Sequence, residues 1–190
     1  VTGVPLNARL AQELHQLFLA KGVLATTAIE GNTLTEEQVR RRLEGNLELP
    51  PSKEYLWREI DNIVAACNGI ADDLFEHRAH GLSVELVAEF NRLVLRNLPL
   101  AEHVVPGEFR QYAVTAGRYE GAPAEDCPYL LERLCRWMNE EKGNVPRGDE
   151  IVFAVIRAVL AHLYMVWIHP FGDGNGRTAR LVEYRFLLEA

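Results

Sequence analysis

The chain has 190 residues, of which 48% are hydrophobic, so it is long enough to bury the core of one domain. Its formal net charge of −7 argues against a broad nucleic-acid-binding surface on this fragment, because such surfaces are basic. Cys67, Cys127 and Cys135 have neither zinc-site nor disulfide-framework spacing, so we expect reduced core thiols in a cytoplasmic protein.

The elements expected along the chain are mainly helices, in an N-terminal helical region over residues 1–50 and a core over residues 51–190. Apolar residues recur at helical spacing over 7–21, 35–45, 53–79, 83–97 and 125–142. Thr35 and Ser83 are the predicted N-caps, and the predicted helix ends are Gly22, Gly45, Gly81 and Gly143. The chain begins without Met and reaches Ala190 within a helical pattern, so we expect the core to continue beyond it.

The segment Thr26-Thr27-Ala28-Ile29-Glu30-Gly31-Asn32 contains the spacing of a helix capping box at Thr27 and Glu30. A second such pair, Thr35 and Gln38, stands at the start of the next predicted helix. The local pattern alone therefore makes Glu30 a capping residue.

Residues 106–123 differ from the helical remainder. The stretch 109–116 is rich in β-prone residues, and Gly117 and Gly121 bracket a turn. We expect a β-hairpin on a helical body, with a plain surface loop as the alternative.

A long apolar helix is predicted over residues 150–168. It contains Arg157 and His162, and its amphipathic period indicates a buried helix rather than a membrane span. Pro170 ends this helix, the run Gly172 to Gly176 forms a tight turn, and a second helix is predicted over 178–188.

The turn between these helices gathers residues that suit a Mg-bound polyphosphate and a hydroxyl to be deprotonated. A glycine-rich turn that opens a helix directs backbone N–H groups at an anion. Arg177 and Arg180 lie three residues apart on the second helix and can reach the same anion. Asp173 offers an oxygen ligand for Mg²⁺, and His169 can accept a proton near neutral pH.

Other phosphate and metal motifs do not match this turn. It lacks the Gly-Lys-Ser/Thr ending of a P-loop, and its glycines follow a helix rather than the strand of a dinucleotide fold. Thr178 and Tyr184 occupy the positions where an EF-hand loop needs glycine and glutamate.

Residues 169–180 resemble the signature of the Fic family, H-x-F-x-[DE]-G-N-G-R-x-x-R, at every fixed position. The resemblance implies a Fic-type helical bundle with a β-hairpin flap, and Mg-ATP-dependent transfer of AMP to a hydroxyl side chain of a target protein. It implies His169 as general base, Asp173 as the Mg²⁺ ligand and Phe171 as a core anchor of the loop. The phosphate-binding residues that it implies are Gly174, Asn175, Gly176, Arg177 and Arg180.

The same resemblance extends to two further segments. The hairpin over 109–123 would cover the nucleotide and bind the target by strand addition. Its nucleotide contacts would come from Val114, Thr115, Ala116 and Gly117. Thr26, Glu30 and Gly31 match the family's inhibitory motif [ST]-x-x-x-E-[GN], found in a subgroup with its inhibitory helix before the Fic core. Glu30 would then pair with Arg180 and keep the γ-phosphate of ATP from binding productively.

The leading hypothesis is therefore an autoinhibited protein adenylyltransferase. Some family members transfer phosphate or UMP, and some remove AMP from a target, so these activities stay open; the intact Gly176 favours adenylylation. A non-enzymatic, nucleotide-sensing regulator is the third hypothesis, and the acidic charge and His169 argue against it. We expect a target protein bearing a Ser, Thr or Tyr hydroxyl as partner, and neither membrane nor nucleic acid. A homodimer stays open.

Overall fold

The computed structural model covers the whole chain and describes residues 21–46, 49–76, 80–116, 119–140 and 148–189. Residues 21–29 are helical. The elements that follow are α2 (Glu36–Leu43), η1 (Pro51–Lys53), α3 (Glu54–Phe75), α4 (Val84–Leu95), β1 (Thr115–Ala116), β2 (Tyr119–Glu120), η2 (Ala124–Asp126), α5 (Cys127–Glu140), α6 (Glu150–Ile168) and α7 (Asn175–Leu188). The predicted mainly helical fold is confirmed. Two compact units divide the chain, Val1–Val64 and Ala65–Ala190, with the boundary inside α3.

In the first unit, the helix over 21–29 passes through Gly22, so the predicted helix end at Gly22 is wrong. The predicted helix over 7–21 lies outside the described residues apart from Lys21. The helix instead ends after residue 29, and Gly31 follows it with a left-handed φ of 93°, which favours glycine. Thr27 therefore lies inside a helix, where its hydroxyl donates to the carbonyl of Val23 at 2.9 Å. The alternative interpretation of Thr27 and Glu30 as a capping box is wrong, because this is the C-terminal end of a helix.

Asn32 joins this helix end to the first part of α3. Its side-chain amide donates to the carbonyl of Leu56 at 2.7 Å and to the carboxylate of Glu59 at 2.8 Å. Its Oδ1 accepts the N–H of Leu34 at 3.0 Å. This buried amide thus connects three segments of the first unit.

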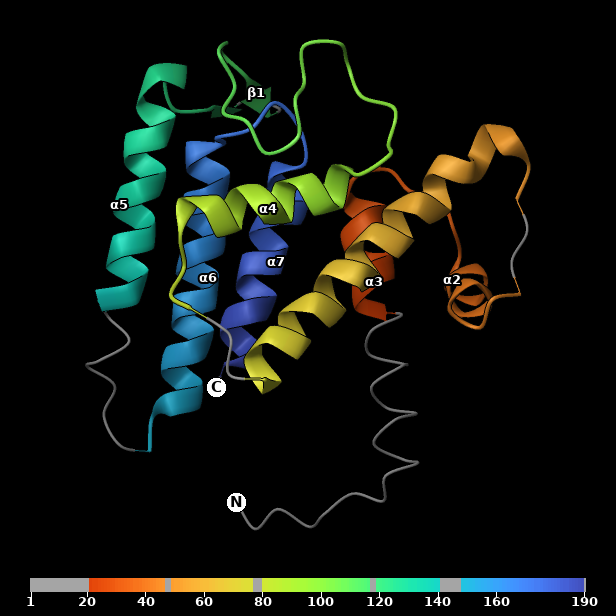
Figure 1. The fold of residues 1–190 in the computed structure, drawn as a ribbon, viewed down its shortest axis with the longest axis horizontal. Coiled ribbons are helices and arrows are strands. Elements are labelled where there is room, and N and C mark those ends of the chain that lie inside the picture. Colours follow the sequence, from red (N-terminus) through yellow and green to blue (C-terminus); the bar gives the residue numbers. More distant parts are fainter. Residues whose placement is uncertain (1–20, 47–48, 77–79, 117–118, 141–147, 190) are drawn as a thin grey trace. The chain divides into compact units, whose positions relative to one another are not determined.

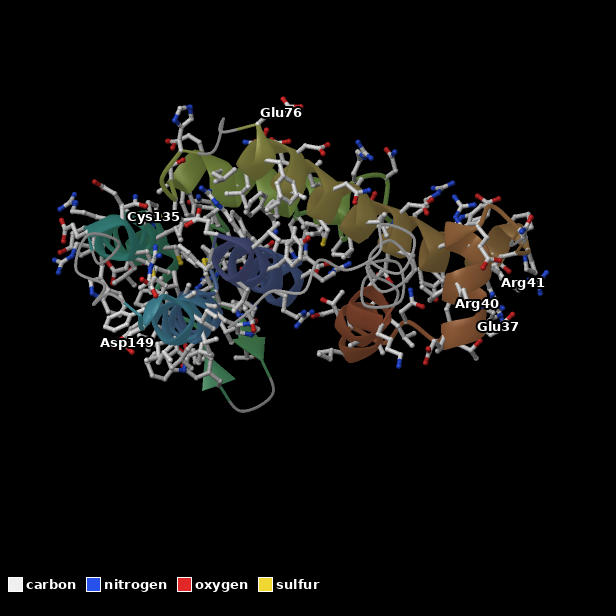
Figure 2. The ribbon with its side chains drawn as sticks, turned by 90° about the horizontal axis from the view of Figure 1, so that it is seen from below. Glu37, Arg40, Arg41, Glu76, Cys135 and Asp149 are labelled. Carbon is white, nitrogen blue, oxygen red and sulfur yellow. The ribbon has the colours of Figure 1, made fainter. Side chains whose placement is uncertain are left out.

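Helix α2 begins as the sequence predicts, with a capping box. Thr35 accepts the backbone N–H of Gln38, and the Gln38 side chain accepts the N–H of Thr35. On its solvent side Glu37 and Arg40 form an ion pair at 2.8 Å (Figure 2). Being exposed, that pair contributes little to stability.

The second unit is built around the helical hairpin of α6 and α7, with α5 beside α6 and α4 across α7 (Figure 1). Ala158, Ala161 and Ala179 are fully buried in these helices, and such small side chains allow close helix packing. Ser83 caps α4 by accepting the N–H of Leu86, as predicted. The close pairing of α6 with α7 holds both ends of the turn that joins them.

Helix α6 is buried on one side only, which corrects the expectation of a buried helix. By length and composition it could cross a membrane, because an 18-residue stretch of it has a mean hydropathy of 2.1. In this structure 33% of that stretch is buried. Its buried Arg157 donates to the carbonyl of Met138 in α5 at 2.9 Å. The exposed apolar side chains are Ile151, Val152, Val155, Ile156, Val159, Leu163, Tyr164 and Trp167.

All three cysteines are free and buried, as predicted. Burial raises the pKa of the Cys67 thiol to about 11 and that of Cys135, on α5 (Figure 2), to about 12. Burial also raises the pKa of Cys127, although the charge of Arg110 opposes the shift. Few of these thiols are ionised near neutral pH.

We therefore expect the native protein to resist alkylation by iodoacetamide at about pH 8, because the thiolate is the reactive form. Protein unfolded in urea should gain one adduct on each of the three cysteines. Intact mass spectrometry before and after unfolding measures both states. Rapid labelling of the native protein would contradict the burial of these thiols.

Candidate active site

The candidate base, His169, is the residue at which α6 ends. It adopts a left-handed conformation (φ 51°, ψ 56°), and its N–H still donates to the carbonyl of Met165 at 3.0 Å. Its Nδ1 lies 3.3 Å from the carbonyl of Val166. A carbonyl can only accept, so Nδ1 carries the proton of a neutral ring and Nε2 becomes the basic position.

The turn after His169 is braced by one buried amide. Asn175 accepts the N–H of Phe171 at 2.9 Å and donates to the carbonyl of the same residue at 2.8 Å. Phe171, only 1% exposed, stacks on Phe109 with ring centroids 6.0 Å apart. Phe171 is thus the core anchor that was predicted. The side chain of Asn175 therefore braces the turn from within, at the backbone of Phe171.

Helix α7 begins at Asn175, three residues earlier than predicted, so Asn175, Gly176 and Arg177 form its first turn. Gly174 precedes it with a φ of 73°, and a Cβ there would lie 3.0 Å from the Leu95 side chain. Only glycine fits this position without strain. The N–H groups of a first helical turn have no carbonyl partner within the helix and attract anions.

The charged side chains of the turn lie at the start of α7. Arg177, which is buried, has its Nη2 3.3 Å from Oδ1 of Asp173, whose side chain is 46% exposed. The N–H of Gly174 also donates to this oxygen at 2.5 Å. Arg180 is half-buried one turn further along α7. A carboxylate open to solvent therefore adjoins an anion-attracting helix start.

The fit of this site to Mg²⁺ rests on Asp173 alone. Among the described residues, no group of three or more His, Cys, Asp or Glu side chains could hold a metal ion. Mg²⁺ commonly binds through one or two carboxylates together with substrate phosphates and water. The residues present therefore suit a Mg²⁺ ion that arrives with a polyphosphate.

Asn91 on α4 supports the turn from outside the motif, and sequence reasoning missed it. Its fully buried amide donates to the carbonyl of Asp173 at 2.9 Å and to the Thr178 hydroxyl at 3.2 Å. Its Oδ1 accepts the N–H of Gly107 at 2.8 Å. The available signal was a polar residue on a helix face that is otherwise apolar, which requires a buried partner.

The predicted hairpin is present, although its strands are short. Thr115 pairs with Glu120 and Ala116 with Tyr119 in antiparallel register. It lies over the end of α6 that leads into the turn (Figure 1), where the Tyr119 hydroxyl donates to the carbonyl of Trp167 at 2.8 Å.

The base of the hairpin is packed tightly against His169. The N–H of Gly121 donates to the carbonyl of Val114 at 3.0 Å. A Cβ at Gly121 would lie 3.2 Å from Cβ of His169. The structure thus brings Val114, Thr115 and Ala116 to the His169 end of α6, and the predicted contact at Gly117 lies outside the described residues.

The predicted regulatory residues Thr26 and Glu30 belong to the first unit, whereas Arg180 belongs to the second. The pairing of Glu30 with Arg180 therefore stays a prediction.

Comparison with known proteins identifies the family of this arrangement. A model of the Fic/DOC family matches residues 81–187, more than half of the chain. The relative named protein adenylyltransferase fic-1 from Caenorhabditis briggsae is 33% identical over 92% of this chain and 32% of its own length. The protein adenylyltransferase Fic of Drosophila grimshawi is 32% identical over 97% of this chain and 36% of its own length. The chain thus spans about a third of the length of these curated relatives.

Solved structures share the fold over nearly the whole chain. A Fic-domain-containing signaling protein from Bacteroides thetaiotaomicron aligns with a TM-score of 0.81 and 25% identity, covering 97% of this chain and 68% of that one. A fragment of Fic-1 from C. elegans aligns with a TM-score of 0.77 and 29% identity, covering 99% and 53%.

Proposed function

Because the chain belongs to the Fic/DOC family, we propose that it transfers AMP from ATP to a hydroxyl side chain of a target protein. The curated relatives described above are named protein adenylyltransferases, which supports this activity. The observation that carries the proposal is a single braced turn with His169 at its entrance and the start of α7 at its exit. A proton acceptor and an anion-binding helix start are thereby held a few residues apart.

In the proposed reaction, the hydroxyl oxygen of the target attacks the α-phosphorus of ATP. The bond from that phosphorus to the oxygen bridging to the β-phosphate breaks, and pyrophosphate leaves. His169 accepts the hydroxyl proton at Nε2. The first turn of α7, with Arg177 and Arg180, stabilises the phosphate charge, and Arg180 binds the γ-phosphate. Such positioning and charge stabilisation dominate the catalysis of phosphoryl transfer.

We propose that Asp173 binds the Mg²⁺ ion that accompanies ATP. When bound, the ion neutralises phosphate charge and orients the leaving pyrophosphate. The target would lie along residues 109–123 by strand addition to the hairpin. The buried, free thiols support a cytoplasmic location for the protein.

Asp173→Ala should remove the Mg²⁺ dependence of ATP binding, because it deletes the carboxylate that faces solvent at this turn. Titration calorimetry with ATP, in Mg²⁺ and in EDTA, should give different affinities for the unmodified protein and equal affinities for the variant. Asp72→Ala, which removes an exposed aspartate from α3, is the matched control and should behave like the unmodified protein. Retention of the Mg²⁺ effect in Asp173→Ala would reject this assignment.

The reaction class can be tested with the Glu30→Gly protein and ATP labelled on either its α- or its γ-phosphate. Transfer of only the α-label to protein is the expected result. Transfer of only the γ-label would indicate a phosphotransferase, and preference for labelled UTP would indicate transfer of UMP. Release of AMP from protein modified beforehand would indicate removal of AMP. Nucleotide binding with no transfer of any kind would favour the nucleotide-sensing regulator.

A further inference from the structure

Arg110 is a buried arginine at the root of the hairpin, outside the motif of residues 169–180. It is 3% exposed and follows the isolated bridge between Phe109 and Phe171. Its guanidinium donates to four backbone carbonyls: from Nε to His169 at 2.7 Å, from Nη1 to Tyr112 at 2.6 Å, and from Nη2 to Ala122 and, at 3.4 Å, to Ile168.

These four carbonyls belong to two parts of the candidate site, the end of α6 and the hairpin. Those of Ile168 and His169 stand at the C-terminal end of α6, where helix carbonyls lack partners and carry partial negative charge. Those of Tyr112 and Ala122 flank the hairpin, one before β1 and the other after β2. One positive side chain therefore ties both ends of the hairpin to the backbone of the candidate base.

The contacts of Arg110 matter for His169 because the backbone of His169 is left-handed. A residue with a Cβ seldom adopts the left-handed region, so surrounding contacts must hold it there. The Arg110 backbone adds a contact on the next residue, since its N–H donates to the carbonyl of Pro170 at 3.0 Å. Arg110 thus contacts the carbonyls of three consecutive residues, Ile168, His169 and Pro170.

We propose that Arg110 is a positioning residue, which fixes the position of the hairpin relative to the His169 ring. It acts through the backbone and touches no reacting atom. Lysine cannot replace it, because an ammonium group lacks the planar fork needed to reach carbonyls in several directions. The effect of Arg110 on rate rests on the proposed function, whereas its effect on the hairpin does not.

Arg110→Lys is the test, and Arg157→Lys is its matched control. Arg157 is also a buried arginine that donates to a backbone carbonyl, that of Met138, but it lies inside α6 away from the turn. We expect Arg110→Lys to lower kcat for AMP transfer by about 100-fold and to leave KM for ATP within about threefold, as for a misplaced catalytic group. Arg157→Lys should leave both constants near those of the unmodified protein. The kinetic constants of both variants are measured on protein that circular dichroism shows to be folded.

Amide hydrogen exchange gives a readout that needs no activity. Peptides covering residues 112–122 should exchange at least about tenfold faster in Arg110→Lys than in the unmodified protein, and should be unchanged in Arg157→Lys. If Arg110→Lys does not fold, Arg110→Gln, whose amide still donates to fewer carbonyls, is judged by the same criteria.

Equal exchange of residues 112–122 in the Arg110 and Arg157 variants would overturn the proposal. An unchanged kcat despite faster exchange would overturn it too. If the unmodified protein and its Glu30→Gly form transfer no AMP, the proposed function fails, and the exchange measurement still decides whether Arg110 holds the hairpin.

Discussion

His169→Ala should lower the rate of AMP transfer by about 10²–10⁴-fold, the usual cost of losing a general base. ATP binding should stay within about threefold, because the phosphates are assigned to the start of α7 rather than to the His169 ring. The contact from Nδ1 to the carbonyl of Val166 makes Nε2 the ring atom that would accept the proton of the target hydroxyl. Incorporation of α-labelled AMP and calorimetric titration of ATP measure the two quantities on the same preparation.

His169→Asn is a sharper version of the same experiment. Asparagine tolerates the left-handed backbone better than alanine, so it keeps the φ of 51° found at this position while removing the base. His162→Ala is the control on the same helix, because His162 pairs with Glu183 at 2.7 Å away from the turn. Equal transfer rates for the unmodified protein and both His169 variants would remove His169 from the mechanism.

The residues that could be predicted from the sequence are contiguous. The two helices and the turn between them are visible from apolar spacing, Pro170 and the glycines, and the motif assigns a role to each side chain. Arg110 and Asn91 could not be found in this way, because their contacts join residues 59 and 82 positions apart. Sequence spacing does not report such long-range hydrogen bonds, although an isolated buried amide or guanidinium always requires partners.

The two Thr-x-x-Glu/Gln patterns show where local reading fails. Thr35 and Gln38 form a capping box, whereas Thr27 and Glu30 have the same spacing at the opposite end of a helix. The four-residue pattern carries no information about the residues before it. Only the helical state of residues 21–26 distinguishes the two cases. The amphipathic period of α6 similarly predicts a buried helix, but apolar residues also occupy its exposed side, so the period alone does not show that only one side packs.

Glu30→Gly should raise the rate of AMP transfer by about 10–100-fold. If Glu30 pairs with Arg180, the γ-phosphate of ATP competes with an internal carboxylate for this guanidinium. A charged hydrogen bond of this kind is worth roughly 1.5–3 kcal/mol, which corresponds to that change in the competent population. Arg180→Ala should not restore activity, because it also removes the proposed γ-phosphate ligand, and the double variant should resemble Arg180→Ala.

Thermal unfolding of the same Glu30→Gly protein separates this brake from a structural role. Glu30 follows the last helical residue of 21–29, where the helix dipole disfavours a carboxylate, so its removal should change stability by less than about 0.5 kcal/mol. Glu44→Gly is the matched control, because Glu44 occupies the C-cap of α2 and pairs there with Arg40. It should leave the transfer rate unchanged. A Glu30→Gly protein that loses stability and gains no activity would reject autoinhibition, since the carboxylate would then serve only the fold of the first unit.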